Sequence, residues 1–379
     1  MQEYDEAVFV TKPNLPSLDK VYPYLVKIWE EKTLTNNGPF HKIFERKLAE
    51  YLKAENINLF CNGTLALMIG LQALRISGEV ITTPFSFAAT THALKWNNIS
   101  PVFCDIEENS MNIDPNKIEA LITPKTSAIL PVHVYGHPCD TEEIQNIADK
   151  YGLKVIYDAA HAFGVRLKDK NLFLEGDMSI LSFHGTKLFT TFEGGAVISK
   201  DEGLKKRIDY LKNFGFADEV TVTAPGINAK MNEFQSVIGF LSLEIVEEEI
   251  ANRKKLAEAY FERLKDIDGV KVYDEFDNYE YNYAYLPILI QKGKYKILRE
   301  EVYNTLKNHN IFSRRYFYPL ISNMPPYRGL ASANKENLPT ANKIADQILC
   351  LPLYGSLDEQ KVHHICMIIK SVLQEKLQC

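Results

Sequence analysis

The chain lacks a strong charge excess, a long apolar run and an evident targeting segment. Its formal net charge is −6, and its 43 Lys and Arg residues form no long basic tract, which argues against nucleic acid or an anionic membrane as a general partner. No apolar run approaches the roughly 20 residues that span a bilayer, and the N-terminus carries early acids without a signal-peptide core. We therefore expect a cytoplasmic protein with no membrane or nucleic-acid partner.

The cysteines are also uninformative as a group, because they are scattered and include no C-x-x-C pair. No histidine stands at metal-ligand spacing from them, so neither a disulfide framework nor a metal site is expected, and free thiols are the simplest interpretation. A Walker motif and a G-x-G-x-x-G fingerprint are missing too, which argues against a nucleotide hydrolase or a Rossmann dehydrogenase. The cysteines are Cys61, Cys104, Cys139, Cys350, Cys366 and Cys379.

What is present is a pattern typical of an α/β protein. The hydrophobic content is 46% and the charged content 24%, which suits a soluble chain with a sizeable core. Over the first two thirds, short apolar runs such as EVITTP, LKVIYDA and GAVIS alternate with amphipathic helical segments. Several of these runs do not alternate with polar residues, as expected when helices cover both faces of a parallel sheet.

Beyond this region the alternation of short strands and helices ends, because the pattern of residues 233–264 predicts one long helix with few helix-breaking residues. We therefore predict a large domain at 1–240 and a smaller α+β domain at 241–379. The N-terminal arm is expected to pack on the second domain.

The run SFHGTKLFTTFEGGAV, residues 182–197, raises a chemical question about Lys187. It stands between a strand-like segment and a Gly-Gly turn. A single loop lysine is usually a solvated surface charge. An amine that is buried or near another cation has a lowered pKa, however, and an aldehyde cofactor can then capture it as an imine. Other features must decide between the two interpretations.

One such feature is Asp158, which ends the apolar strand in VIYDAAHAFG. A buried acid costs desolvation free energy unless a positive group meets it, and a protonated pyridine ring is such a group. The alternative is an aspartate that caps the following turn.

Two further segments suit a phosphorylated, planar ligand. In LFCNGTLAL, Asn62, Gly63 and Thr64 precede a helix, and backbone amides at a helix N-terminus bind anions. In TPFSFAATTHAL, Phe85 or Phe87 is placed to stack on a planar ring. A plain helix cap and ordinary core aromatics are the respective alternatives.

Taken in order, the segments NGT, PFSFAAT, PVHVYGHPCD, YDAAHAFG, SFHGTK, FEGGAV and GINAKMNEFQ resemble the sugar aminotransferases of the DegT/DnrJ/EryC1/StrS family. The resemblance covers about residues 38–355. It implies the pyridoxal-phosphate-dependent transferase fold of type I, the aspartate aminotransferase fold. Such a fold has a large domain with a mixed, mostly parallel seven-stranded sheet flanked by helices, and a smaller α+β C-terminal domain.

The resemblance also implies roles for individual residues. Lys187 would bind pyridoxal 5'-phosphate covalently and shuttle protons, and Asp158 would pair with the pyridinium nitrogen. Phe87 would stack on the ring, and His161 would approach its oxygen substituents. The cofactor phosphate would be held by Gly63, Thr64 and Ser182.

A homodimer with shared active sites is implied as well, because Asn228 resembles the asparagine that reaches the phosphate of the neighbouring subunit. The chain departs from the family at His161, Lys230 and Phe192, where Gln, Arg and Gly are common. It keeps Lys187, where members that dehydrate have histidine, so amination is favoured. The candidates for the sugar-nucleotide cleft are His184, Glu193, Arg314, Tyr316 and Tyr318.

These implications give a specific prediction of activity. The amino group of L-glutamate would pass through pyridoxamine phosphate to the keto carbon of a nucleotide-linked deoxysugar. The wording of SFHGTK and FEGGA is similar to members that act at C4, so dTDP-4-keto-6-deoxyglucose is the expected acceptor and dTDP-4-amino-4,6-dideoxyglucose the product. The alternatives are a C3 or UDP-ketosugar aminotransferase, a dehydratase of the same fold, or a non-enzymatic regulator.

Overall fold

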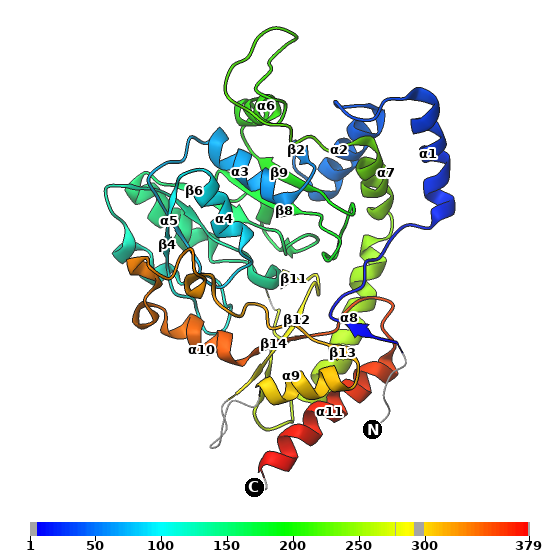
Figure 1. Ribbon diagram of the computed structural model, residues 1–379, viewed down its shortest axis with the longest axis vertical. Helices are drawn as coiled ribbons and strands as arrows, with labels where there is room; N and C mark the ends of the chain where they lie inside the picture. The colour runs from blue at the N-terminus through cyan, green and yellow to red at the C-terminus, as the bar shows by residue number, and fades with distance from the viewer. Residues whose placement is uncertain (1–5, 277, 292–298, 378–379) are drawn as a thin grey trace.

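A computed structural model describes residues 6–276, 278–291 and 299–377. Its centre is a seven-stranded sheet in the order β2-β9-β8-β6-β5-β3-β4 (Figure 1). Only β9 runs against its neighbours; the other strands point the same way. The mixed, mostly parallel sheet is therefore confirmed. The strands are β2 (Asn56–Phe60), β3 (Glu79–Thr82), β4 (Ser100–Phe103), β5 (Thr126–Leu130), β6 (Lys154–Asp158), β8 (Met178–Ser182) and β9 (Gly195–Ser199).

Helices cover both faces of this sheet, and the sequence of β9 shows why. Val197 packs into a cluster with α3 (Gly63–Ala73), α4 (Ala89–Trp96) and α6 (Glu202–Leu211), whereas Ala196 and Ile198 pack into the opposite cluster. Since successive strand residues point to opposite faces, a strand covered on both sides is apolar throughout. The opposite face is covered by α2 (Pro39–Leu52), α5 (Thr141–Tyr151) and α7 (Glu233–Ser242).

A second apolar core lies below the sheet in Figure 1. Its antiparallel sheet has the order β10-β12-β14, and Val8 of β1 (Val8–Phe9), which pairs with β13 (Ile311–Phe312), is fully buried in the core. The elements are α8 (Val246–Leu264), α9 (Arg299–Asn308), α11 (Glu359–Leu377), β10 (Val270–Val272), β12 (Leu286–Ile290) and β14 (Ile348–Leu351). The division at residue 240 falls within α7 and stays a prediction.

The single helix predicted for 233–264 is wrong, because the chain turns between α7 and α8. The N–H groups of Glu244 and Ile245 donate to the carbonyls of Leu241 and Ser242, three residues back, which tightens the backbone. Three glutamates then occupy the first turn of α8, where negative charge is favourable. The sequence contains no Gly or Pro at this turn, so the end of α7 could not be predicted from helix-breaking residues.

The remaining elements lie outside the two sheets described above. In the part of the chain that the structure describes, no helix has the length and apolar character needed to cross a membrane. The segment PNKIEALI forms two short 3₁₀ turns, and Cys379 lies outside the described residues. The other elements are α1 (Leu18–Glu31), α10 (Pro339–Gln347), β7 (Arg166–Leu167), β11 (Tyr279–Glu280) and 3₁₀ turns at Pro115–Lys117, Glu119–Leu121, Val134–Gly136, Leu172–Leu174, Ile321–Asn323, Ala331–Ala333 and Lys335–Asn337.

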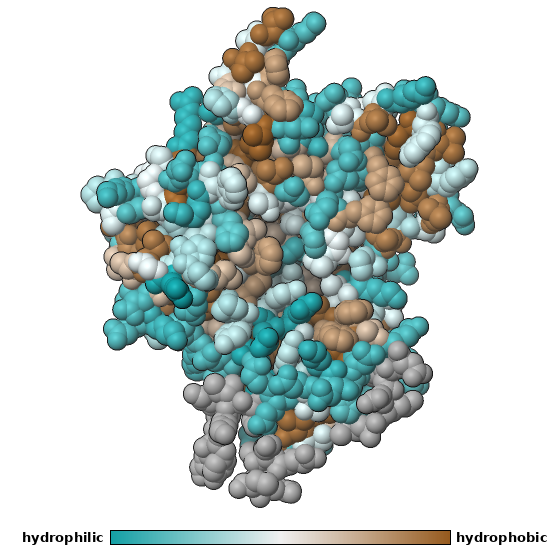
Figure 2. Space-filling view, in the orientation of Figure 1, coloured by the Kyte–Doolittle hydropathy of each residue, from teal (hydrophilic) through white to brown (hydrophobic). Residues whose placement is uncertain are grey.

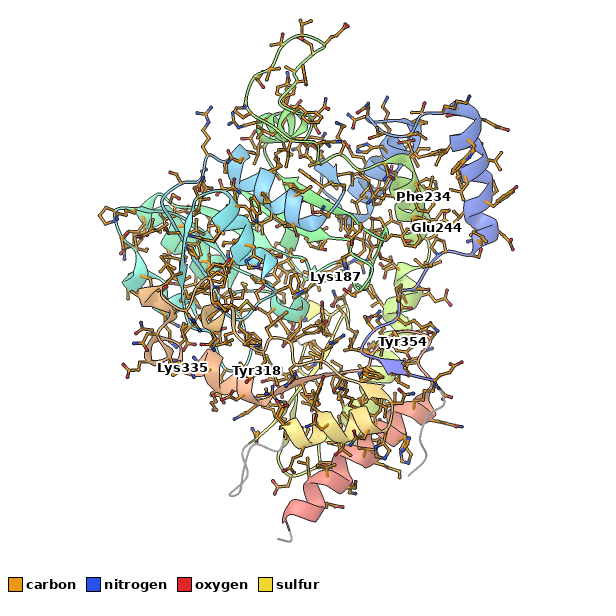
Figure 3. The ribbon with its side chains drawn as sticks, viewed as in Figure 1. Lys187, Phe234, Glu244, Tyr318, Lys335 and Tyr354 are labelled. Atoms are coloured by element: carbon orange, nitrogen blue, oxygen red, sulfur yellow. The ribbon has the colours of Figure 1, made fainter. Side chains whose placement is uncertain are left out.

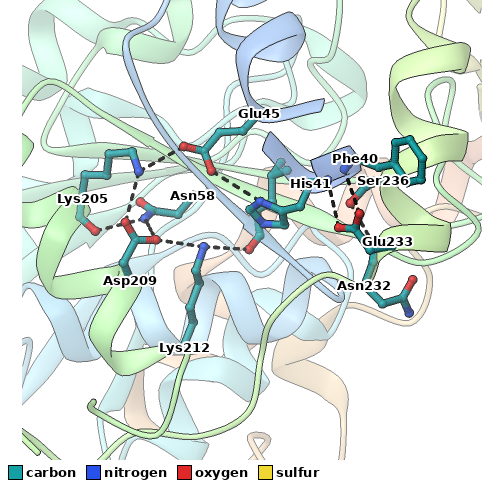
Figure 4. A network of polar contacts seen from close by, with 11 residues as sticks. Phe40, His41, Glu45, Asn58, Lys205, Asp209, Lys212, Asn232, Glu233 and Ser236 are labelled. Carbon is teal, nitrogen blue, oxygen red and sulfur yellow. Dashed lines mark hydrogen bonds and ion pairs between the residues drawn. The ribbon is translucent and has the colours of Figure 1, made fainter. Parts of the chain in front are cut away.

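A buried polar network joins α6 and the loop after it to β2 (Figure 4). Lys212 is 1% exposed. Its Nζ lies 2.9 Å from Asp209 Oδ1 and donates to the carbonyl of Leu59 at 3.3 Å. Asp209 also accepts from Asn58 Nδ2 at 2.8 Å and Lys205 Nζ at 3.1 Å. The network satisfies a cation that would otherwise be costly to bury.

Candidate active site

The carboxyl ends of β2, β3, β6 and β8 surround a cavity of about 270 Å³. This is the edge of an open α/β sheet at which ligands usually bind. Figure 3 shows Lys187 there, between the large sheet and the second core. The cavity brings together ten of the predicted residues: Gly63, Thr64, Phe87, Asp158, His161, Ser182, His184, Lys187, Glu193 and Tyr316.

Lys187 belongs to the loop that follows β8. Its N–H donates to the carbonyl of His184 at 2.8 Å, which fixes a tight turn. Its Nζ donates to Tyr285 Oη at 3.2 Å. Burial lowers the pKa of the amine to about 8, although the charge of Asp158 opposes this shift. A substantial fraction of the amine is therefore neutral, and nucleophilic, near neutral pH.

Asp158 ends β6 and is 8% exposed. Its Oδ2 accepts from Thr90 Oγ1 at 2.7 Å and its Oδ1 from the N–H of Ala160 at 3.1 Å. Burial raises the pKa of the carboxyl, while these hydrogen bonds and the charge of Lys187 oppose the rise. Among the described residues no Lys, Arg or His side chain forms an ion pair with this carboxylate within 4.0 Å.

His161 lies beneath the same cavity and is 4% exposed. Its Nδ1 accepts from the backbone N–H of Tyr135 at 3.2 Å, so the neutral ring carries its proton on Nε2. Burial lowers its pKa well below the ordinary value, and the charge of Lys187 adds to this shift. The ring stacks on Phe317, with the centroids 5.8 Å apart. His161 is therefore a rigid, neutral donor rather than a cation.

The start of α3 forms a second polar side of the cavity. Asn62 caps the helix by accepting from the N–H of Leu65 at 2.8 Å. Gly63 and Thr64 begin the helix, so their N–H groups have no carbonyl one turn back and are available to an anion. A Cβ on Gly63 would lie 2.9 Å from Cβ of Ser182. The close approach that brings the Ser182 side chain beside the helix N-terminus therefore requires glycine.

His184 and Glu193 line the outer part of the cavity. Their Nε2 and Oε1 atoms lie 3.5 Å apart, and both side chains are about half exposed, at 49% and 56%. An exposed pair of this kind contributes little to stability, so both groups remain available to a ligand.

The structure does not bring three predicted residues to this cavity. Asn228 is exposed in the loop between α6 and α7, where it pairs with Asn213. Arg314 is exposed and pairs with Cys350 in the second core. Tyr318 is 46% exposed and lies well away from Lys187 in Figure 3.

Several residues that line the cavity were not assigned a role from the sequence, among them Thr90, Thr186, Tyr285 and Phe317. Thr90 stands in TPFSFAATTHAL four residues after Ser86, and this spacing of two hydroxyl groups could have indicated that both lie on one side of the segment. Tyr285 comes from the tyrosine-rich run YEYNYAYL, in which no single tyrosine is distinguished. Its position depends on how the second core packs against the sheet.

Comparisons with known proteins agree with this geometry. The chain is 54% identical to a dTDP-4-amino-4,6-dideoxy-D-glucose transaminase from Escherichia coli, covering 96% of this chain and 98% of the relative. It is 46% identical to a transaminase of the same name from Shigella dysenteriae, over 97% and 100% of the two chains. The crystal structure of DesI in the presence of its TDP-sugar product superposes with a TM-score of 0.92 at 33% identity, over 98% of this chain and 94% of DesI.

The fold of type I and the predicted class of enzyme are thereby confirmed. The model of the DegT/DnrJ/EryC1/StrS aminotransferase family matches residues 19–370. The protein belongs to the DegT/DnrJ/EryC1/StrS aminotransferase family.

Proposed function

We propose that this protein is a cytoplasmic, pyridoxal-phosphate-dependent aminotransferase that moves an amino group from L-glutamate to C4 of dTDP-4-keto-6-deoxyglucose. The products would be 2-oxoglutarate and dTDP-4-amino-4,6-dideoxyglucose. One observation carries the proposal: Lys187, whose amine has a pKa lowered to about 8, and the buried carboxyl group of Asp158 line one cavity. The 54% identity to the Escherichia coli transaminase supports the choice of sugar.

The cavity fits pyridoxal phosphate at three places. Asp158 would hold a protonated ring nitrogen. The N–H groups of Gly63 and Thr64, with the hydroxyl of Ser182, would hold the phosphate. Phe87 lines the cavity and would cover a ring face. When bound, this cofactor supplies an aldehyde that accepts amino groups and a ring that withdraws electrons from the bond to the departing proton.

The chain's own groups then have separate tasks. Lys187, as a free neutral amine, takes the proton from the α-carbon of glutamate and later returns a proton to the sugar carbon that receives nitrogen. Asp158 keeps negative charge at the base of the cavity. His161 offers a neutral Nε2–H donor. His184 and Glu193, half exposed at the outer side, are placed to contact the sugar nucleotide.

A homodimer with shared sites forms part of the proposal. Large apolar side chains are exposed on α1, including Leu18 at 72% and Trp29 at 74%, and on the loop between α6 and α7, including Phe214 at 50% and Val220 at 85%. Figure 2 shows apolar surface at both places, at the upper right and at the top. Exposed apolar surface of this extent suits an interface. A second copy would then be able to bring Asn228 to the phosphate.

The test is a panel of dTDP-, UDP- and GDP-linked ketosugars, each incubated with the enzyme and L-glutamate. We expect release of 2-oxoglutarate only with dTDP-4-keto-6-deoxyglucose, and NMR should locate the new nitrogen at C4 in the gluco configuration. Nitrogen at C3, or acceptance of a UDP-ketosugar instead, would replace the proposed substrate. Bound cofactor without 2-oxoglutarate release would favour a dehydratase, and failure to bind cofactor would favour a regulator.

A further inference from the structure

The side chain in contact with the Lys187 amine is a tyrosine, not an acid. Lys187 Nζ donates to Tyr285 Oη at 3.2 Å and lies 5.8 Å from the centroid of the same ring. Among the described residues, no carboxylate lies within 4.0 Å of this amine. The position of the amine is therefore set by a hydrogen bond to Tyr285.

Tyr285 is itself held against the loop that follows β6. Its ring packs edge-on against His161, with centroids 4.9 Å apart. The preceding residue, Ala284, donates its N–H to Asn282 Oδ1 at 3.0 Å, and its carbonyl accepts from Arg253 Nη1 at 3.3 Å. Asn282 Nδ2 donates to the carbonyl of His161 at 2.8 Å. The tyrosine is thus tied to the loop that follows β6, which also carries the acid of the site.

The chemistry of the phenol suits this contact. Burial raises the pKa of Tyr285, so the phenol stays neutral and accepts a hydrogen bond without adding negative charge. An acid in its place would raise the pKa of Lys187 and keep the amine protonated. The other titratable groups that face the amine are Asp158, His161 and Tyr316.

We propose that Tyr285 is a positioning residue for Lys187: its phenol oxygen holds the amine whenever the amine is free. It thereby fixes the point from which Lys187 takes and returns a proton. This inference rests on the proposed function, since it concerns the state in which Lys187 works as a base and acid. A misplaced base would still be reactive but would transfer protons slowly.

The first test uses the protein without cofactor. Lysines are labelled competitively with acetic anhydride over a range of pH, and the extent at Lys187 is measured by peptide mass spectrometry. In Tyr285→Phe the ammonium loses an acceptor, so its apparent pKa should fall by about 1 unit and labelling at pH 7 should rise about fivefold. Tyr283→Phe is the matched control, because Tyr283 is a buried tyrosine that does not line the cavity.

The second test uses the enzyme loaded with cofactor. In Tyr285→Phe we expect kcat to fall by about 30-fold, while KM for L-glutamate stays within about twofold. If Lys187 is labelled faster while kcat is lower, Tyr285 positions the amine, because a general loss of structure would not give both results. Tyr285→Leu provides a second variant if Tyr285→Phe does not fold, and either variant that folds decides the question.

The inference is overturned if the pKa of Lys187 or kcat is unchanged in the folded variant. Failure of the proposed function is a different result. If no ketosugar is aminated by the unmodified protein but the labelling shift is found, the hydrogen bond stands and the substrate is wrong. If amination occurs and Tyr285→Phe has no effect on either quantity, the function stands and Tyr285 has no positioning role.

Discussion

Lys212 is buried and Lys187 is partly buried, and the partners of their amines differ. Lys212 lies 2.9 Å from a carboxylate of Asp209 and donates to a backbone carbonyl. Lys187 meets the neutral phenol of Tyr285 at 3.2 Å, and its acid, Asp158, is not in contact with it. Both lysines follow a regular element, Lys187 in the loop after β8 and Lys212 directly after α6.

The partners distinguish a lysine that stabilises the fold, Lys212, from a lysine that is reactive, Lys187. Burial opposes ionisation of Asp209, but the charges of Lys212 and Lys205, together with hydrogen bonds, outweigh it and keep the pKa of that carboxyl below its ordinary value. At Lys187 the charge of Asp158 opposes the effect of burial only in part, and the pKa of the amine falls to about 8. Burial alone therefore does not make a lysine reactive; burial without a contacting acid does.

The largest expected effect comes from deleting each amine and measuring activity. Lys187→Met should lower the rate of 2-oxoglutarate release by about 10⁴-fold, because the base and the covalent anchor are both lost. Lys212→Met should retain kcat within a few-fold in the fraction that folds, since Lys212 does not line the cavity. If Lys212→Met lost as much kcat as Lys187→Met, the distinction would fail.

Replacing each of the two acids by asparagine tests the same difference between the two sites. Asp158→Asn should lower kcat by about 10³-fold, because the cavity loses its fixed negative charge. Asp209→Asn should leave kcat within about twofold, as its partner lies in the structural network. Steady-state kinetics at saturating substrate distinguish the two, and a near-native kcat for Asp158→Asn would remove that residue from the mechanism.

Lys212→Met should lower the free energy of unfolding although it leaves kcat nearly unchanged. Lys212→Met leaves Asp209 without its closest cation, and breaking a buried pair usually costs 3–5 kcal/mol. The Asp209 side chain is 31% exposed, so we expect a smaller loss, about 2 kcal/mol in the free energy of unfolding at pH 7. Urea denaturation provides the measurement, and an unchanged midpoint would show that the network carries no net stability.

Lys187→Met should instead stabilise the cofactor-free protein. The pKa of Lys187 is about 8 in the fold against 10.5 when unfolded, so the unfolded chain binds more protons between those values and stability rises with pH there. Below pH 8 the buried cation costs about 3 kcal/mol in full. The attraction to Asp158 is already included in this pKa, and because Lys187 is partly exposed, solvent screening reduces the expected gain to about 2 kcal/mol at pH 7. The gain should disappear above pH 10.5.

Much of this organisation could be predicted from the sequence, and the exceptions have physical reasons. Asp158 and Ser182 end apolar runs, and carboxyl ends of parallel strands meet at one edge, so their proximity follows from the pattern. Strand β2 was not recognised, because asparagines occupy two of its five positions. Tyr285 is 98 residues from Lys187 and directly precedes β12, and a contact over this separation depends on tertiary packing that no local sequence pattern predicts.

The smallest effect concerns a hydroxyl next to the acid. Thr90 Oγ1 donates to Asp158 at 2.7 Å, whereas the neighbouring hydroxyl of Thr91 is buried and has no partner among the described residues. Thr90→Val removes a hydrogen bond to the carboxylate, so the pKa of Asp158, already raised by burial, should rise further by about 1 unit.

Binding of pyridoxal phosphate to the cofactor-free protein, followed by fluorescence over a range of pH, measures this shift. The acid limb of the affinity should move to higher pH in Thr90→Val and stay in place in Thr91→Val. Because both variants exchange threonine for valine one position apart on α4, equal shifts would mean that the helix, not the hydrogen bond, tunes the acid. A shift in Thr90→Val alone would show that a neutral hydroxyl group sets the pKa of Asp158, whereas charged neighbours set the pKa of Asp209.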